Sequence, residues 1–252
     1  MAVLAYHRAD GFSNTDGDGR YAYYEMGGVP TSKFNGTTTV VGGWSGVYGA
    51  YVDAYETEIQ SPSPCTLNVL VDYDPATLLL KVKATVFAVD GFANARLRYA
   101  LAESHMPFQW ATLDSLHHVV RKMLPDYLGV VMPVMSPNDT FVDSQSYTLN
   151  RRWVDENCYV VVFVQDDSDK SVLRSAKVGS IMPPLYGDAN GDGEVSIGDA
   201  VFVINYLFRD DVAPDPLASG DSNGDCVVDV VDVVYLINYL FNEGSSPEQG
   251  CA

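Results

Sequence analysis

A tandem repeat near the C-terminus constrains this chain more than any other feature of its sequence. Residues 188–209, DANGDGEVSIGDAVFVINYLFR, align on residues 221–242, DSNGDCVVDVVDVVYLINYLFN, at an offset of 33, with 12 of 22 positions identical. Each copy opens with the spacing Asp-x-Asn-x-Asp and reaches another aspartate at position 12, which is the pattern of a calcium loop. A polar turn that caps a helix would explain one copy equally well. Two copies in register favour a cation site in each.

The residue types in each loop predict the ligands of two calcium ions. Side chains at positions 1, 3 and 5 of a tight loop converge on one point, where Ca²⁺ takes about six to eight oxygens, whereas the smaller and stiffer octahedron of Mg²⁺ fits less well. The first predicted set is Asp188, Asn190, Asp192, the carbonyl of Glu194, Ser196 and Asp199. The second predicted set is Asp221, Asn223, Asp225, the carbonyl of Val227, Asp229 and Asp232.

More than half of the net charge of the chain lies in this repeat. Residues 187–242 contain eleven acidic residues and one arginine, so they carry −10 of the net charge of −18. The acids alternate with apolar segments, which cannot pack until a cation neutralises the carboxylates. A chain this acidic repels a phosphate backbone, which argues against nucleic-acid binding. The sequence also lacks a run of about 18 apolar residues, so no membrane span is predicted.

Two loop–helix units with aspartate at position 12 resemble the type I dockerin domain over about residues 187–242. The resemblance implies a small all-α module, spanning residues 186–252, that folds around calcium and plugs into a cohesin domain. Two departures stand out. Position 6 of the second loop is Cys226, where glycine is usual, and positions 10 and 11 are Ile197-Gly198 and Val230-Val231, where small hydroxyl residues are frequent. The partner is therefore a cohesin-like domain or an apolar surface of the chain's own β-sandwich.

The segments that follow the two loops are apolar nearly all round. Because an exposed helix needs only one apolar stripe, the excess predicts both a helix–helix contact and a second apolar surface for a partner. The residues assigned to that partner surface are Val203, Leu207, Leu236 and Leu240. The duplicated Ile-Asn-Tyr-Leu-Phe segment would let either helix present a similar surface, and self-assembly through it is a further alternative.

Residues 62–182 are rich in strand patterns. Apolar stretches separated by Asp-Pro, Asp-Gly and Asp-Asp-Ser-Asp turns predict an antiparallel β-sandwich of immunoglobulin-like type. The predicted strands are Thr66–Tyr73, Leu78–Val89, Ala95–Glu103, Thr140–Leu149, Tyr159–Gln165 and Ser171–Val178. Between them, Leu116, Val120 and Met123 have helical spacing, which predicts a short helix over Leu113–Leu124.

Residues 1–61 have a different pattern. The predicted elements are a strand over Val3–His7, a helix over Arg20–Met26, a hairpin of Thr31–Phe34 with Thr38–Val41, and a helix over Gly46–Ile59. This order, with Gly28-Val29-Pro30-Thr31 before the hairpin, resembles the C-terminal half of a thioredoxin fold, in which that proline is cis. With Tyr6-His7, Tyr23-Tyr24 and the following sandwich, residues 1–180 resemble a thioredoxin-like, outer-membrane-protein-related family of secreted surface proteins. Thioredoxin chemistry needs a Cys-x-x-Cys pair, and this sequence has none.

The four cysteines lack the spacing of a metal site and suit an oxidising compartment, where they allow three pairings. Cys65 and Cys158 each open a predicted strand and could join the two sheets, while Cys226 and Cys251 could clasp the C-terminus onto the second loop. Free thiols in a cytosolic protein are the alternative, but calcium loops would be empty at cytosolic calcium levels. We therefore predict an extracellular or cell-surface location.

No catalytic constellation emerges from the sequence. The histidines, His7, His105, His117 and His118, lack a chelating spacing, and residues 14–25, which formally match a third calcium loop, are interpreted as a loop before a helix. We predict a multidomain, mainly β, non-enzymatic chain that acts in adhesion or assembly. Its parts are the partial thioredoxin-like segment, the β-sandwich and the calcium-loop module. The alternatives are a thiol–disulfide oxidoreductase relative without its Cys-x-x-Cys half and a structural surface-layer or filament subunit.

Overall fold

The computed structural model describes residues 2–110, 113–182, 185–209, 211–248 and 250. The chain divides into two compact units, residues 1–182 and residues 183–252, which we call the N-terminal unit and the C-terminal unit. The N-terminal unit is mainly β and the C-terminal unit is helical, as predicted. The finer division of the N-terminal unit at residue 61 remains a prediction.

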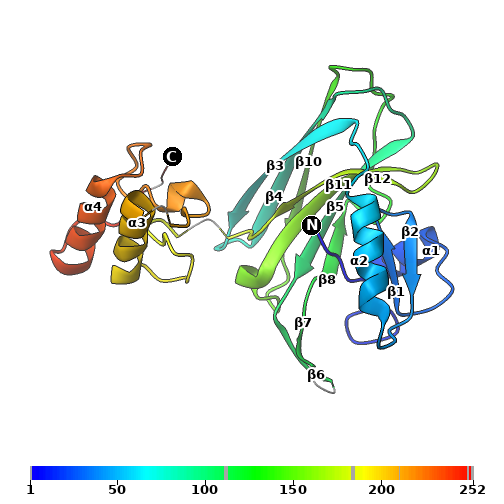
Figure 1. Ribbon diagram of the computed structural model, residues 1–252, viewed down its shortest axis with the longest axis horizontal. Coiled ribbons are helices and arrows are strands. Elements are labelled where there is room, and N and C mark those ends of the chain that lie inside the picture. The colour runs from blue at the N-terminus through cyan, green and yellow to red at the C-terminus, as the bar shows by residue number, and fades with distance from the viewer. Residues whose placement is uncertain (1, 111–112, 183–184, 210, 249, 251–252) are drawn as a thin grey trace. The chain divides into compact units, whose positions relative to one another are not determined.

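Two antiparallel sheets form the centre of the N-terminal unit (Figure 1). The smaller sheet has the order β10-β4-β3, and the larger has the order β12-β11-β5-β8, with β9 also paired to β5. The strands of the smaller sheet are β3 (Cys65–Asp74), β4 (Leu79–Ala88) and β10 (Thr140–Thr148). Those of the larger sheet are β5 (Ala95–Glu103), β8 (Val119–Leu124), β9 (Val130–Val131), β11 (Cys158–Asp166) and β12 (Val172–Val178). The six predicted strands are thereby confirmed to within one residue at each end.

The alternation of side chains explains how these strands pack. In β4 the buried residues Leu80, Val82, Ala84, Val86 and Ala88 occur at every second position and face the core between the sheets. Strands β5 and β11 are instead buried along almost their whole length. Their two faces belong to two apolar clusters, one between the sheets and one on the outer face of the larger sheet. The larger sheet is therefore covered on both sides.

The predicted helix over Leu113–Leu124 is wrong. This segment forms β7 (Leu113–Leu116), which pairs with β6 (Met106–Trp110), and then β8, which pairs with β5. Opposite Leu101 and Ala102 the register shifts, because Lys122 pairs with Leu101 whereas Val120 pairs with Ala102. This bulge places Val120 and Met123, three residues apart, in the same cluster. An extra residue in a strand thus imitates the spacing of a helix.

The first 61 residues cover the outer face of the larger sheet (Figure 1). They form α1 (Thr15–Tyr23), the hairpin β1 (Thr31–Phe34) and β2 (Thr38–Val41), and α2 (Val47–Glu58). The predicted hairpin and second helix are confirmed, while α1 begins five residues before the predicted start at Arg20 because Asn14 caps it, accepting a hydrogen bond from the Gly17 amide at 2.9 Å. The predicted strand over Val3–His7 is reduced to a single parallel bridge between Ala5 and Val119. The Val29–Pro30 peptide bond is cis, as the resemblance implied.

Polar contacts hold this N-terminal segment to the sheet. The side chain of Asn14 donates to the Val120 carbonyl at 2.8 Å, and Asp16 accepts from both the Lys122 side chain and the Met123 amide. Asp16 is therefore engaged in an ion pair with strand β8. A third calcium loop would instead need Asp16 as a ligand of the ion. Residues 15–23 are therefore a helix capped by Asn14, so the interpretation as a loop before a helix is wrong for residues 15–19.

The C-terminal unit is built from α3 (Ile197–Arg209) and α4 (Val230–Phe241), with a short 3₁₀ turn over Leu217–Ser219 between them. Its small core is shared by the two copies of the repeat. The buried apolar residues of this core are Ala189, Ala200, Val203, Val233 and Leu236. Among the residues that the structure describes, no helix is long and apolar enough to cross a membrane.

The cysteines of the N-terminal unit do not form the predicted bond. Cys65 and Cys158 are both buried free thiols at the edge of the core between the sheets. They behave as small apolar residues there, which explains their burial without a disulfide. The predicted bond between Cys226 and Cys251 remains a prediction, because residue 251 lies outside the described residues.

Candidate metal centre

The first loop of the repeat is closed by hydrogen bonds to its own aspartates. Asp188, at position 1, accepts from the amides of Asp192 at 3.1 Å and Gly193 at 2.9 Å. Asp199, at position 12, accepts from the amides of Asn190 at 3.1 Å and Ser196 at 2.7 Å. The carboxylates at positions 1 and 12 thus fold the chain between them into a compact turn that ends where α3 begins.

The second loop repeats these bonds at an offset of 33. Asp221 accepts from the amides of Asp225 at 3.1 Å and Cys226 at 3.0 Å. Asp232 accepts from the amides of Asn223 at 3.2 Å and Asp229 at 2.8 Å. The agreement between the two loops extends to every bond of positions 1 and 12, so the repeat in the sequence is also a repeat in three dimensions.

Position 6 shows how the second loop accommodates its cysteine. Gly193 has a φ of 91° in the first loop, and Cys226 has a φ of 72° in the second. Position 4 is glycine in both loops, with φ values of 72° for Gly191 and 71° for Gly224. Cys226 therefore adopts the left-handed conformation that favours glycine, at a cost of about 1–2 kcal/mol. The second loop therefore keeps the turn of the first, although cysteine replaces the usual glycine at this position.

Buried negative charge is the property of these loops that most favours a cation. Asp199 and Asp232 have no exposed surface, and within the described residues they accept only backbone amides and take part in no ion pair. Burial raises the pKa of Asp232, and the neighbouring Asp221 carboxylate adds to this effect. A buried carboxylate without a positive partner destabilises a fold. The donor set of carboxylate, amide and carbonyl oxygens is the one that calcium takes.

The side chains at positions 3 and 5 of each loop are bonded to each other. Within the described residues, no three His, Cys, Asp or Glu side chains are arranged to hold an ion. Asn190 instead donates to Asp192 at 2.9 Å, and Asn223 donates to Asp225 at the same distance. Positions 3 and 5 therefore bond to each other in both loops. A cation would have to replace these two bonds and draw the oxygens toward one centre.

The apolar surface of the C-terminal unit differs from the predicted one. Val203 and Leu236 are fully buried in the core that the two helices share, Leu207 packs against that core, and Leu240 is partly buried. These four residues therefore do not form a free face. The exposed apolar residues lie one position or more away along each helix. Eight of them lie at matching positions of the repeat, namely Ile197, Val201, Ile204 and Phe208 on α3, and Val230, Val234, Ile237 and Phe241 on α4.

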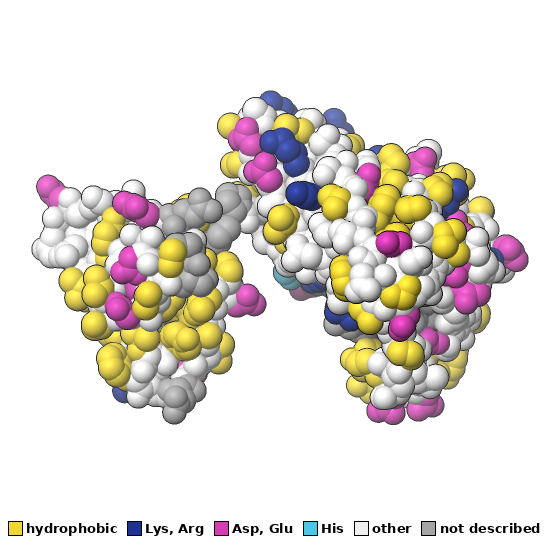
Figure 2. All heavy atoms as spheres, turned by 90° about the horizontal axis from the view of Figure 1, so that it is seen from above, with side chains coloured by type: hydrophobic (Ala, Val, Ile, Leu, Met, Phe, Trp, Pro, Cys, Tyr) yellow, Lys and Arg dark blue, Asp and Glu magenta, His cyan; other side chains and the backbone are white. Residues whose placement is uncertain are grey.

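These eight exposed residues, which we call the paired stripe, follow the same spacing on both helices. Each residue of α3 matches one of α4 at the offset of 33, and three of the four pairs are identical in type. The most exposed pair is Phe208 and Phe241, at 70% and 66%. Figure 2 shows hydrophobic side chains across the visible face of the C-terminal unit, on the left, with acidic side chains between them. The identity of the two copies at these positions was the signal in the sequence that could have found this surface.

Comparisons with solved structures give matches to proteins of Porphyromonas gingivalis. HBP35 of Porphyromonas gingivalis matches with a TM-score of 0.54 at 14% identity, covering 69% of this chain and 62% of that chain. The present chain thus spans less than two thirds of that structure, and the likeness is one of fold. A domain of the outer membrane lipoprotein Omp28 from Porphyromonas gingivalis matches with a TM-score of 0.34 at 15% identity, covering 47% of this chain and 88% of that chain.

Comparisons of sequence describe the C-terminal unit. A search of curated proteins finds no match. The family model of the dockerin type I domain matches residues 186–241. That range contains both calcium loops, both helices and the paired stripe. The resemblance inferred from the two loops is therefore confirmed over residues 186–241.

Proposed function

We propose that this chain is a non-catalytic assembly protein of the cell surface or extracellular space, which attaches to a cohesin-like protein partner through its calcium-loaded C-terminal unit. The observation that carries this proposal is the paired stripe, an apolar surface repeated on two helices directly after two calcium loops. Exposed apolar residues arranged in this way are typical of a protein interface. The match of residues 186–241 to the dockerin type I domain supports the same role.

Calcium acts in this proposal as a condition for folding. Two ions, one in each loop, would neutralise the buried carboxylates of Asp199 and Asp232 and order the turns that start α3 and α4. The proposed ligands are the two sets predicted from the sequence. Extracellular calcium, at millimolar levels, would fill sites that cytosolic calcium leaves empty, which supports the proposed location. A bond between Cys226 and Cys251 would further restrain the second loop, and non-reducing peptide mapping tests it directly.

The chemistry of the paired stripe indicates what the partner offers. Positions 10 and 11 of the loops, which flank the start of each helix, include the exposed apolar residues Ile197, Val230 and Val231. A partner that reads hydroxyl groups at these positions would leave its polar groups unpaired against them. The proposed partner surface is therefore apolar, and it would accept either helix because both carry the same residues.

A pull-down from the surface fraction of the source organism, with calcium and with chelator, tests this proposal. We expect one defined partner to be retained in calcium and released by chelator. Phe208→Lys or Phe241→Lys alone should weaken binding only modestly, whereas the double variant should abolish it. The matched control is Val142→Lys, an exposed apolar residue on β10 of the N-terminal unit. Retention by the double variant, or calcium-independent retention by the wild type, would refute the proposal.

Two other occupants of the paired stripe, the chain's own β-sandwich and a second copy of the chain, can be distinguished with the same wild-type and double-variant proteins. If the paired stripe covers the chain's own β-sandwich, hydrogen exchange of that sandwich should rise in the double variant with no partner present. If copies of the chain assemble into a layer or filament, sedimentation in calcium should show large species that the double variant lacks. Either result would replace the cohesin-like partner with an occupant from the chain itself.

A further inference from the structure

A cavity of about 900 Å³ lies in the N-terminal unit, between the N-terminal segment and the outer face of the larger sheet. This volume lies within the range of about 300–1,000 Å³ that is usual for organic ligand sites. Aromatic rings from the segment before α1, the hairpin, α2 and β11 line much of its wall. These residues are Tyr6, Phe34, Tyr48, Tyr51, Tyr55 and Phe163. A site of this kind takes a ligand with an apolar, preferably aromatic, body.

Arg20, from α1, supplies a buried positive charge to the same cavity. Its side chain is 1% exposed, and its guanidinium lies over the rings of Tyr23 and Tyr24 at 4.4 and 4.7 Å. Nη2 donates to the Tyr24 hydroxyl at 2.8 Å and to the Gln165 side-chain oxygen at 2.7 Å, both of which are neutral acceptors. Nε and Nη1 are buried without a hydrogen-bond partner in the described part of the chain, and no carboxylate there forms an ion pair with Arg20.

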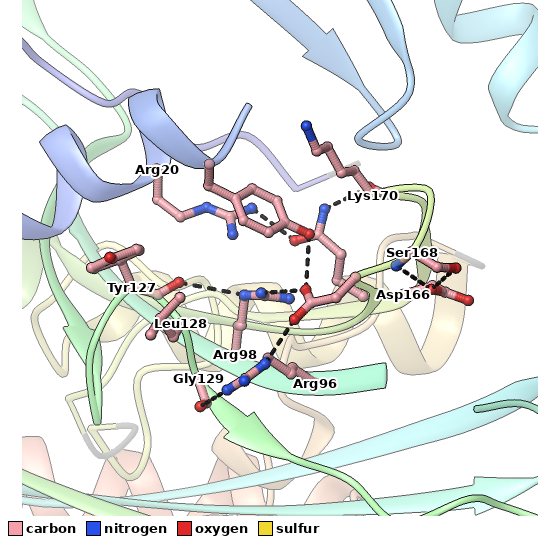
Figure 3. A network of polar contacts seen from close by, with 12 residues as sticks. Arg20, Arg96, Arg98, Tyr127, Leu128, Gly129, Asp166, Ser168 and Lys170 are labelled. Atoms are coloured by element: carbon pink, nitrogen blue, oxygen red, sulfur yellow. Dashed lines mark hydrogen bonds and ion pairs between the residues drawn. The ribbon is translucent and has the colours of Figure 1, made fainter. Parts of the chain in front are cut away.

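The acidic side chain that accepts from Tyr23 is already engaged by other arginines. Asp167 accepts from Arg98 at 2.6 Å and from Arg96 at 2.7 Å, and it also accepts from the Tyr23 hydroxyl at 2.9 Å (Figure 3). Arg98 is itself fully buried, with Nη1 unpartnered in the described residues. The single carboxylate of Asp167 is therefore shared by two arginines, and it forms no ion pair with Arg20 among the described residues.

Charge around the cavity has the opposite sign to that of the chain as a whole. Three cationic residues line it, namely Arg8, Arg20 and Lys33, against the single acid Asp10. Asp10 is held by His7 at 2.7 Å. The chain as a whole carries a net charge of −18. A buried guanidinium with unpaired nitrogens costs free energy unless an anion balances it.

We propose that this cavity binds a small organic anion, with a carboxylate or sulfonate directed to Arg20 and an aromatic body held among the tyrosines. Lys33 and Arg8 add attraction at the rim. The aromatic walls would bury the ligand's rings, and the charge of Arg20 would select an acid over a neutral molecule of the same shape. This site is independent of the calcium loops, so it belongs to the full chain with or without calcium.

Two fluorescent probes that differ only in charge test this proposal in the full chain. 8-Anilinonaphthalene-1-sulfonate carries a sulfonate, and N-phenyl-1-naphthylamine has the same rings without it. We expect saturable binding of both, in calcium, with the sulfonate bound more tightly. Arg20→Met should weaken the sulfonate by roughly tenfold or more, because a hydrogen bond to a charged group is lost, and should leave the neutral probe within about twofold. The matched control, Arg174→Met, removes an exposed arginine of β12 and should change neither.

A second variant separates the cavity from other apolar surfaces that attract such probes. Val52, on α2, lines the cavity, and Val52→Trp should fill it and weaken both probes by a similar factor. Binding to the paired stripe would not respond to either substitution. If both variants bind both probes as the wild type does, the proposal is overturned. If Arg20→Met fails to fold, as judged by its melting curve, Val52→Trp decides alone, and unchanged binding by that folded variant overturns the site.

Discussion

Leu236→Ala should make calcium-dependent folding of the C-terminal unit fail at calcium concentrations that suffice for the wild type. Leu236 has no exposed surface, and it is one of five buried apolar residues that form the core of this unit among the residues that the structure describes. Truncation of a fully buried leucine costs about 3 kcal/mol, since the lost transfer energy is joined by the energy of the cavity left behind. A core this small has few neighbours that could move to fill the gap.

Because folding and calcium binding are coupled in our proposal, this loss appears as a shift in calcium affinity. If two ions bind as the unit folds, about 1.5 kcal/mol falls on each, and the half-saturating calcium concentration rises about tenfold. If a single ion were coupled to folding, the whole loss would fall on it, and the rise would be roughly 150-fold. The size of the shift therefore reports how many ions fold the unit.

Hydrogen exchange followed by mass spectrometry measures this shift in the full chain, on peptides from residues 197–209 and 230–241. Ile237→Ala is the matched control, because Ile237 lies one position further along α4, loses the same atoms and is 37% exposed. Its cost should stay under about 1 kcal/mol, and its midpoint should rise roughly twofold. If the midpoints of the two variants agree within a factor of two, either Leu236 does not belong to the core or the unit folds without calcium.

Three further outcomes follow from single residues. Burial raises the pKa of Cys158 to about 12, so iodoacetamide at pH 8 should label this thiol only after denaturation. Burial pushes the pKa of Asp167 upward, but the hydrogen bond and charge of Arg98 outweigh it and lower that pKa. The ion pair thus stabilises the N-terminal unit above pH of about 4, and its contribution is lost as pH falls through the lowered value. Asp167→Asn should lower the melting temperature at pH 7, read by tryptophan fluorescence, and flatten its fall in acid. Asp188→Ala should remove one calcium from calorimetric titrations, whereas Asn14→Ala should cost about 1 kcal/mol and leave the calcium count unchanged.

The alternation of side chains made the sandwich predictable from the sequence. A strand with one buried face shows a period of two, and the turns between strands are marked by aspartate, glycine and proline. The segment from Leu113 to Leu124 was misassigned because its bulge opposite Leu101 is set by pairing with β5, a residue contact distant in sequence. Residue propensity and spacing reflect only neighbours along the chain. They therefore cannot indicate a bulge that arises when one strand pairs with another strand distant in sequence.

The position and repetition of the two Asp-x-Asn-x-Asp turns were predictable from the sequence because the turns are local. Every bond that positions 1 and 12 make with the loop closes within nine residues, and the spacing of the residue types encodes it. The cavity beside Arg20 had no such signal. Its walls come from α1, the hairpin, α2 and β11, which meet only once the N-terminal segment folds over the larger sheet.

Which face of each helix is buried was only partly predictable from the sequence. Both faces of α3 and α4 are apolar, so periodicity alone did not decide between Val203 with Leu236 and the paired stripe. The two copies differ where they are buried, with Ala200 opposite Val233 in the repeat and Val203 opposite Leu236. One shared core needs complementary rather than equal volumes from its two halves.

The copies agree at three of the four exposed pairs of the paired stripe, and folding does not require that agreement. Phe208 and Phe241 are 70% and 66% exposed, so neither contributes much to the core, and a polar residue at either position would keep the helix soluble at little cost. Two exposed phenylalanines at matching positions are instead a liability for a protein with no partner, because they promote association. Their retention in both copies, together with the matching valine and isoleucine, is explained if a partner covers this surface.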